Sequence, residues 1–224
     1  MLRGGAPAWG GWAARRIDIA GPVVETTRMS LVLASASPRR AALLREIGVD
    51  FVVRVSDVPE LPNPGEAPDA FALRAASDKG AAIARVAARD WVLAADTVVT
   101  IDAAILGKPA DDADARAMLH RLGGRTHAVL TAVTLFAPGG CRVAAQVVRS
   151  AVEFRPLDAA EIAAYVAGGE PADKAGAYAI QGGAAAFVRR VEGSISNVIG
   201  LPIDEVRALF ERHGLLARGA TARG

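Results

Sequence analysis

The segment Ser35–Arg40 (SASPRR) contains residue types that bind phosphate. It follows a short apolar run and precedes a helix-forming stretch, and the first turn of a helix offers unpaired backbone N–H groups and a partial positive charge. The hydroxyls of Ser35 and Ser37 add hydrogen-bond donors, and Arg39 and Arg40 add planar guanidinium groups that match phosphate oxygens. The segment therefore predicts a phosphate site, with a plain helix cap and solvated arginines as the alternative.

Two acidic residues could act beside a bound phosphate. Asp96 ends the apolar run WVLAA, so the sequence predicts its carboxylate at the end of a buried strand. Burying an unpaired charge costs more than the ~2–7 kcal/mol of a buried polar group, so this carboxylate must be paired, metal-bound or catalytic, unless it caps a turn. The candidate second carboxylate is Glu60 or Asp57, both in a Pro-rich acidic loop, and solvation is the alternative for either.

Lysine is rare in this chain, with three residues against 23 arginines. Where arginine occupies nearly every basic position, a lysine indicates a need for a compact point charge rather than a planar fork. Lys108 lies between Gly and Pro in the loop LGKP, where its ammonium could hold a phosphate. Lys79 and Lys174 are the other two candidates.

A glycine-containing segment, Asp173–Gly182 (DKAGAYAIQG), could contact a nucleobase. Its glycines allow the backbone to approach a ligand closely, and Gln181 offers both an amide donor and an acceptor. A surface loop without a ligand is the alternative for this segment.

The elements that must position these residues alternate between strand and helix. We expect Ser37, Asp69 and Asp158 to cap helices, Pro202 to begin the last helix, and Asp96-Thr97 to interrupt a strand. Apolar runs predict strands at residues 31–35, 51–55, 91–95, 98–101, 126–136, 142–154 and 186–191. Helical periodicity predicts helices at residues 38–47, 69–88, 112–122, 158–167 and 202–213.

The order of these elements indicates an α/β fold with a mixed sheet. A Pro-Gly-Gly turn joins the two longest predicted strands, which should pair as an antiparallel hairpin beside shorter parallel strands. We expect residues 29–213 to form the domain, with residues 1–28 as a disordered extension, residues 214–224 as a tail and Met29 as a plausible alternative start.

Composition excludes several classes of protein. With 52% hydrophobic and 22% charged residues the chain is not disordered as a whole, and no apolar stretch reaches the ~18 residues of a membrane span. The single cysteine, Cys141, cannot form an internal disulfide, which fits a cytoplasmic protein. The net charge of +2 is spread along the chain without a basic block, so we expect no nucleic-acid partner.

Six segments in order resemble the Maf family of nucleoside triphosphate pyrophosphatases, also described as septum-formation inhibitors: SASPRRAALL, AADTVV, LGKP, GRTHAVLTAV, DKAGAYAIQG and EGSISNVIGLP. The resemblance covers residues 29–210. It implies an elongated, twisted mixed sheet with a cleft, like that of inosine triphosphate pyrophosphatases, and a homodimer. It also implies a divalent cation, Mg²⁺ or Mn²⁺, and hydrolysis of a nucleoside triphosphate to the monophosphate and pyrophosphate.

The resemblance also implies roles for individual residues. Asp96 matches the catalytic carboxylate, as proton acceptor and metal partner, and Glu60 lies where a second acidic residue is common. The positions associated with substrate choice are Arg39, Thr97 and Gln181, and the basic phosphate-binding positions are Arg40, Lys79 and Lys108. Gly80 departs from the pattern, because alanine commonly follows the lysine.

The segment around Gln181 resembles the subgroup that prefers dTTP and UTP, whereas the 7-methyl-GTP subgroup carries glutamate there. A glutamine can accept a hydrogen bond from the ring N3–H of uracil or thymine and donate one to the adjacent carbonyl. We therefore expect a dTTP and UTP pyrophosphatase. A pyrophosphatase for 7-methyl-GTP or other noncanonical purine triphosphates, a cell-division regulator that acts by protein contact, and an arginine-rich nucleic-acid binder are the alternatives.

Overall fold

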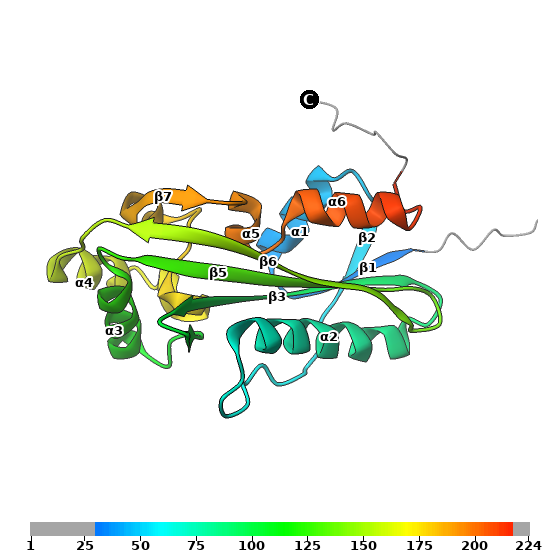
Figure 1. The fold of residues 1–224 in the computed structure, drawn as a ribbon, viewed down its shortest axis with the longest axis horizontal. Helices are drawn as coiled ribbons and strands as arrows, with labels where there is room; N and C mark the ends of the chain where they lie inside the picture. Colours follow the sequence, from blue (N-terminus) through cyan, green and yellow to red (C-terminus); the bar gives the residue numbers. More distant parts are fainter. Residues whose placement is uncertain (1–29, 217–224) are drawn as a thin grey trace, which may run out of the picture.

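A computed structural model describes residues 30–216 as an elongated, twisted mixed sheet with helices on both faces (Figure 1). The sheet has the strand order β2-β1-β3-β5-β6-β7, and β4 pairs with β3 outside this path. Strand β1 pairs parallel with β2 and β3, and the remaining pairs are antiparallel. The predicted mixed α/β fold and its long central hairpin are confirmed. The strands are β1 (Leu31–Ala34), β2 (Phe51–Arg54), β3 (Trp91–Ile101), β4 (Ala104–Leu106), β5 (Thr126–Phe136), β6 (Arg142–Phe154) and β7 (Val188–Glu192).

The helices divide between the two faces and one end of the sheet. Helix α2 runs along one face, α1, α5 and α6 gather over the other, and α3 and α4 lie together at the far end of the long strands (Figure 1). Their bounds are α1 (Pro38–Glu46), α2 (Pro68–Val86), α3 (Asp112–Leu122), α4 (Ala159–Ala167), α5 (Ile195–Ile199) and α6 (Ile203–Arg212). Three short 3₁₀ helices follow α4 along the chain: η1 (Glu170–Asp173), η2 (Ala175–Ala177) and η3 (Gly183–Phe187).

Alternation along the central strands explains this arrangement. In β1, Val32 packs toward α2 while Leu31 and Leu33 pack with α1 and α6, so the strand is buried on both faces. At the far end, a separate apolar cluster joins α3 and α4 to the sheet around Phe154. The pocket described below lies between the apolar residues around β1 and the cluster around Phe154.

Helix α2 packs closely on the sheet because residue 80 is glycine. A Cβ atom at Gly80 would collide with the ring of Phe136 and lie 3.2 Å from the Cβ of Ala94. The departure from alanine at this position therefore accompanies a bulky aromatic residue that fills the space, next to Lys79 on the same helix.

Two sequence predictions about element boundaries were wrong. Strand β3 is continuous through Asp96 and Thr97, because β5 pairs with it without a break from Val92 to Thr100. Helix α2 is not capped by Asp69: it begins one residue earlier, at Pro68, and its N-cap residue, Ala67, has no side-chain acceptor for a capping hydrogen bond.

Two strands that pair with the same edge of β3 leave a gap between them, which we call the notch. Strand β1 pairs with β3 only as far as Ala94, and β4 pairs with the other half of β3 only from Val99. Between them, residues 95–98 have a paired neighbour on the β5 side alone. Asp96 and Thr97 point to opposite faces of the sheet within this notch, toward Lys79 on α2 and toward Asn197 on α5 respectively.

No helix within residues 30–216 is both long enough and apolar enough to cross a membrane. The predicted extension at 1–28 and most of the predicted tail lie outside the described residues, so both stay predictions. Strand β4, helix α5 and the 3₁₀ helices were not predicted, because each has five residues or fewer and shows no clear period.

Candidate active site

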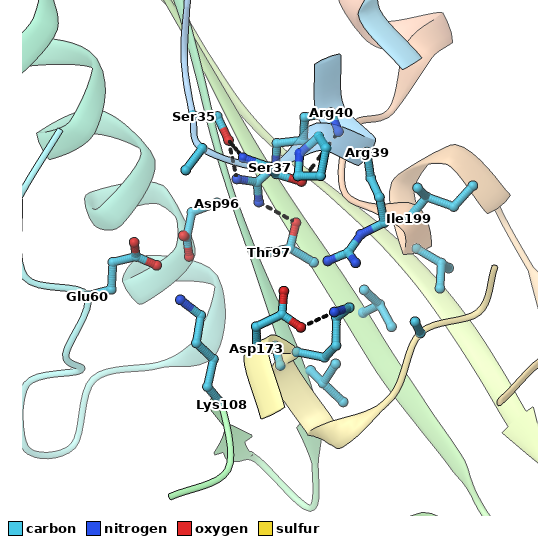
Figure 2. Close-up of a pocket in the computed structure, with 18 of the residues that line it drawn as sticks. Ser35, Ser37, Arg39, Arg40, Glu60, Asp96, Thr97, Lys108, Asp173 and Ile199 are labelled. Atoms are coloured by element: carbon cyan, nitrogen blue, oxygen red, sulfur yellow. Dashed lines mark hydrogen bonds and ion pairs between the residues drawn. The ribbon is translucent and has the colours of Figure 1, made fainter. Parts of the chain in front are cut away.

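A pocket of about 280 Å³ opens at the notch in β3. Its walls come from the β1–α1 junction, the loop after β2, helix α2, the loop after β4, and the segment from η1 to Gln181 (Figure 2). The pocket has a charged end, formed by Glu60, Lys79, Asp96 and Lys108, and a loop end, formed by residues 173–181.

The charged end is organised by a buried lysine. The ammonium of Lys79 lies 2.6 Å from Oδ1 of Asp96 and 2.9 Å from Oε1 of Glu60. Only 9% of the Lys79 side chain and 6% of the Asp96 side chain are exposed, whereas Glu60 is 42% exposed. The pairing with Lys79 removes the desolvation problem that the sequence raised for Asp96.

Neighbouring positive charges also control the ionisation of Glu60. Burial tends to raise the pKa of Glu60, but the hydrogen bond and charge of Lys79, with the charges of Lys108 and Arg40, hold that pKa below its usual value. Glu60 is therefore ionised at neutral pH. The Lys108 side chain points into the pocket toward Asp96 and Glu60 (Figure 2), and within residues 30–216 its ammonium makes no hydrogen bond or ion pair.

The Ser35–Arg40 segment forms the junction between β1 and α1. Ser37 is the N-cap, as predicted, and its hydroxyl accepts a hydrogen bond from the N–H of Arg40 at 3.4 Å. The guanidinium of Arg40 donates to Ser35 Oγ at 3.1 Å, to Thr97 Oγ1 at 3.0 Å and to the carbonyl of Gly200 at 2.8 Å. One of these bonds stays within the segment, and the other two join it to β3 and to Gly200 after α5. Two of the five guanidinium N–H groups remain for a ligand.

Arg39 and Thr97 differ in how freely they could contact a ligand. The guanidinium of Arg39 extends into the pocket toward Asp173 (Figure 2). The hydroxyl of Thr97 forms a hydrogen bond of 2.9 Å with the hydroxyl of Thr131. The Thr131 hydroxyl also donates to the carbonyl of Asn197 at 2.9 Å. Thr97 is therefore held by its neighbours, whereas Arg39 is held by none of the described hydrogen bonds.

The loop end packs directly on β3. Gly176 has a φ of +69°, and a Cβ there would lie 2.9 Å from the Val99 side chain, so only glycine fits. Tyr178 lines the pocket and its hydroxyl lies 2.8 Å from Nε2 of His127 in the core. Gln181 is exposed, and its amide makes no hydrogen bond with any described residue, so both its donor and its acceptor are available.

The acidic pair is the part of the site that could hold a divalent cation. No group of three or more His, Cys, Asp or Glu side chains with metal-binding geometry occurs within residues 30–216. The second carboxylate oxygens of Asp96 and Glu60 nevertheless have no hydrogen-bond partner among these residues. One or two carboxylates supplemented by phosphate oxygens and water form a typical Mg²⁺ site, so this donor set fits Mg²⁺ or Mn²⁺ once a phosphate chain is present.

Lys174 lines this one pocket and Asp57 does not. The ten residues to which the sequence analysis gave roles all line it, although those roles stay predictions: Ser35, Ser37, Arg39, Arg40, Glu60, Lys79, Asp96, Thr97, Lys108 and Gln181. The sequence did not single out Asp173 or the apolar lining residues Val99, Val129 and Ile199. All four of these residues lie within segments of the resemblance, which was the available signal.

The fold and the pocket define an α/β protein with a cleft that combines carboxylates, free cations and an unpaired amide. A model of the Maf family, described as Maf-like protein, matches residues 30–213. The chain is 51% identical over 176 residues to a dTTP/UTP pyrophosphatase of Geobacter metallireducens, covering 79% of this chain and 92% of that protein. It is also 51% identical over 185 residues to a dTTP/UTP pyrophosphatase of Myxococcus xanthus, covering 83% and 93% respectively.

Solved structures similar to this chain include a HAM1 protein from Coxiella burnetii, with 16% identity and a TM-score of 0.46 over 82% of this chain and 99% of that one. The family match and the curated relatives both extend over most of the described residues. The chain belongs to the Maf family.

Proposed function

We propose that this protein is a nucleoside triphosphate pyrophosphatase that hydrolyses dTTP and UTP to the monophosphate and pyrophosphate. The observation that carries the proposal is the placement of a lysine-bridged carboxylate pair and an unpaired glutamine amide at opposite ends of one pocket. The names of the curated relatives support the same reaction and the same two nucleotides.

The charged end suits a triphosphate. Lys108 at one side and Arg39 at the other project into the pocket, and two N–H groups of Arg40 remain available between them. Cations in fixed positions hold a phosphate chain and stabilise the charge that develops on departing pyrophosphate. We assign these three side chains to phosphate binding, with Arg40 also positioning Thr97.

Asp96 is the proposed proton acceptor. Lys79 holds one carboxylate oxygen by a 2.6 Å hydrogen bond, and the other oxygen is free to orient a water molecule and take its proton. Attack of that water on the α-phosphorus breaks the bond to the bridging oxygen between the α- and β-phosphates, and the bridging oxygen leaves with pyrophosphate. Asp96 and Glu60 would hold the divalent cation, which supplies neutralisation of phosphate oxygens when bound.

The loop end suits a pyrimidine base. The Gln181 amide can accept from the ring N3–H of uracil or thymine and donate to an adjacent carbonyl oxygen. Apolar side chains of Val99, Val129 and Ile199 line the pocket and provide surface for the sugar and base.

A panel of canonical and modified triphosphates with pyrophosphate detection tests the proposal. We expect Mg²⁺- or Mn²⁺-dependent release of pyrophosphate and monophosphate from dTTP and UTP above all purine triphosphates. Release of inorganic phosphate instead, or a preference for a purine such as 7-methyl-GTP, would contradict it. We also propose that the protein is a homodimer, which light scattering in solution tests. We propose that it is cytoplasmic, which fractionation of cells tests.

A further inference from the structure

The turn that presents Gln181 is closed at residues 179–182. The N–H of Gly182 donates to the carbonyl of Ala179 at 3.0 Å, which places Gln181 at the third position of a four-residue turn. Gln181 itself makes no hydrogen bond within the described chain, so the position of its amide depends on how the rest of the turn is held.

Two side chains outside the pocket hold this turn at both ends. The hydroxyl of Tyr165, on α4, accepts from the N–H of Ala179 at 3.2 Å. One carboxylate oxygen of Glu170, in η1, accepts from the N–H of Gly183 at 3.0 Å. The same tyrosine hydroxyl donates to the other oxygen of Glu170 at 2.7 Å, so the two anchors are joined to each other.

The space around the turn shows that this clamp is tightly fitted. A Cβ at Gly182 would overlap the carboxylate of Glu170, and a Cβ at Gly183 would lie 3.3 Å from the ring of Tyr165. The Tyr165 ring packs edge-on against Phe187, 5.1 Å between centroids. Burial, and then the bond to Glu170, raise the pKa of Tyr165 above its usual value, so the hydroxyl stays protonated and can donate.

We propose that Tyr165 and Glu170 are positioning residues for substrate choice, because they fix the turn that aims the Gln181 amide at the base. This inference rests on the proposed function. Neither residue lines the pocket, so neither touches the substrate, and both act through the backbone of residues 179–183. Loss of the clamp should therefore impair recognition of the base and leave the charged end intact.

Tyr165→Phe is the direct test, because it removes the hydroxyl and keeps the ring on Phe187. We expect KM for UTP and dTTP to rise about tenfold and the preference for UTP over GTP to fall by a similar factor, with kcat within about twofold, as one unpaired N–H would give. Unchanged KM and preference, or a loss confined to kcat, would overturn the proposal.

A double-mutant cycle separates this role from general stabilisation. If Tyr165 acts through Gln181, Tyr165→Phe should change kcat/KM by less than about twofold when Gln181→Ala is already present. Additive losses would overturn the proposal. Glu170→Gln provides the same cycle if Tyr165→Phe does not fold, because its amide keeps the size of the carboxylate but cannot accept from both partners.

Glu161→Gln is the matched control on the same helix. It breaks a bidentate ion pair with Arg155, at 2.6 and 2.9 Å, that does not contact residues 179–183. We expect lower stability with unchanged KM and base preference, and equal effects in both variants would overturn the positioning role. Wild-type protein that releases no pyrophosphate from any triphosphate contradicts the proposed function, whereas active wild type with an unaffected Tyr165→Phe contradicts only this inference.

Discussion

The charged end and the loop end of the pocket are built from different kinds of structure. At the charged end, Asp96 lies within an eleven-residue strand and Lys79 within a nineteen-residue helix, and both side chains are buried and paired. At the loop end, Gln181 lies in a turn between short 3₁₀ helices and is exposed and unpaired. In the proposed function, the proton acceptor and its lysine partner thus lie on rigid elements and the base-binding amide on a loop, while Glu60 and Lys108 reach the charged end from loops.

This difference indicates how one scaffold could serve different bases. Charged groups within the sheet and helix are fixed by core packing, so replacing them with side chains of another size or shape disturbs the fold as well as the site. A turn held by a few hydrogen bonds can change its side chains at little cost to the core. The comparison predicts large losses of rate from the charged end and changes of preference from the loop end.

Asp96→Asn should produce the largest effect. The amide keeps the shape and can still bond to Lys79, which retains Glu60 as its ionised partner, so the protein should stay folded. An amide cannot take a proton from water, and we expect kcat for UTP to fall about 100-fold or more. Steady-state kinetics with circular dichroism as the folding control checks this, and a rate within threefold of wild type would refute the role of Asp96.

Gln181→Glu should produce a smaller change, of preference more than of rate. A carboxylate cannot donate to the pyrimidine carbonyl, and one unmatched acceptor costs roughly 1–3 kcal/mol, or about five- to 150-fold in kcat/KM for UTP and dTTP. Because the sequence resemblance associates Arg39 and Thr97 with substrate choice as well, full activity on 7-methyl-GTP is not expected from this one change. Equal ratios among dTTP, UTP, GTP and 7-methyl-GTP in parent and variant would show that the loop end does not read the base.

His127, which contacts Tyr178 of the loop end, should make the free energy of unfolding depend on pH. Burial lowers the pKa of His127 from 6.5 to about 4, because its imidazole is enclosed by Phe154 and Tyr178. The unfolded chain therefore binds a proton that the folded chain does not, and stability is complete above pH 6.5 and lost as the pH falls toward 4. Between pH 7.5 and 5 this one group should cost about 2 kcal/mol.

Urea unfolding of wild type and His127→Gln at both pH values isolates this effect. The glutamine does not titrate, so the variant should lose about 2 kcal/mol less than wild type on acidification, while other groups contribute equally to both. The same loss in both proteins would mean that His127 is protonated in the folded state.

The sequence predicted which residues meet at the pocket better than it predicted the elements around them. Residue types such as the rare Lys79 and Lys108 carry their own signal, because their chemistry is visible without a structure. The prediction for Asp96 found a buried carboxylate for the right reason but placed it at a strand end. A period-two pattern cannot reveal that a charged residue continues a strand when a lysine on another element neutralises it.

What the sequence could not predict depends on contacts between distant segments. The notch in β3 arises because β1 stops at Ala34, opposite Ala94, and β4 stops at Leu106, opposite Val99, and neither end follows from local composition. The Tyr165–Glu170 clamp likewise depends on contacts with Ala179 and Gly183, 14 and 13 residues further along the chain. Short elements such as α5 form because the packing around Asn197 favours them, rather than through propensity alone.

Deletion of residues 1–28 should produce the smallest effect, since both ends of the pocket are built from residues after Ser30. The deleted segment has no periodic apolar face that a core would need. We expect kcat/KM for UTP within about twofold of the full chain and a Tm within about 2 °C, which is under ~1 kcal/mol for a domain of this size. Deletion through residue 36 is the contrasting control, because it removes the buried strand β1 and should abolish folding. A full loss of activity from the shorter deletion would instead place part of the site before Ser30, and the division of the pocket into two ends would then be incomplete.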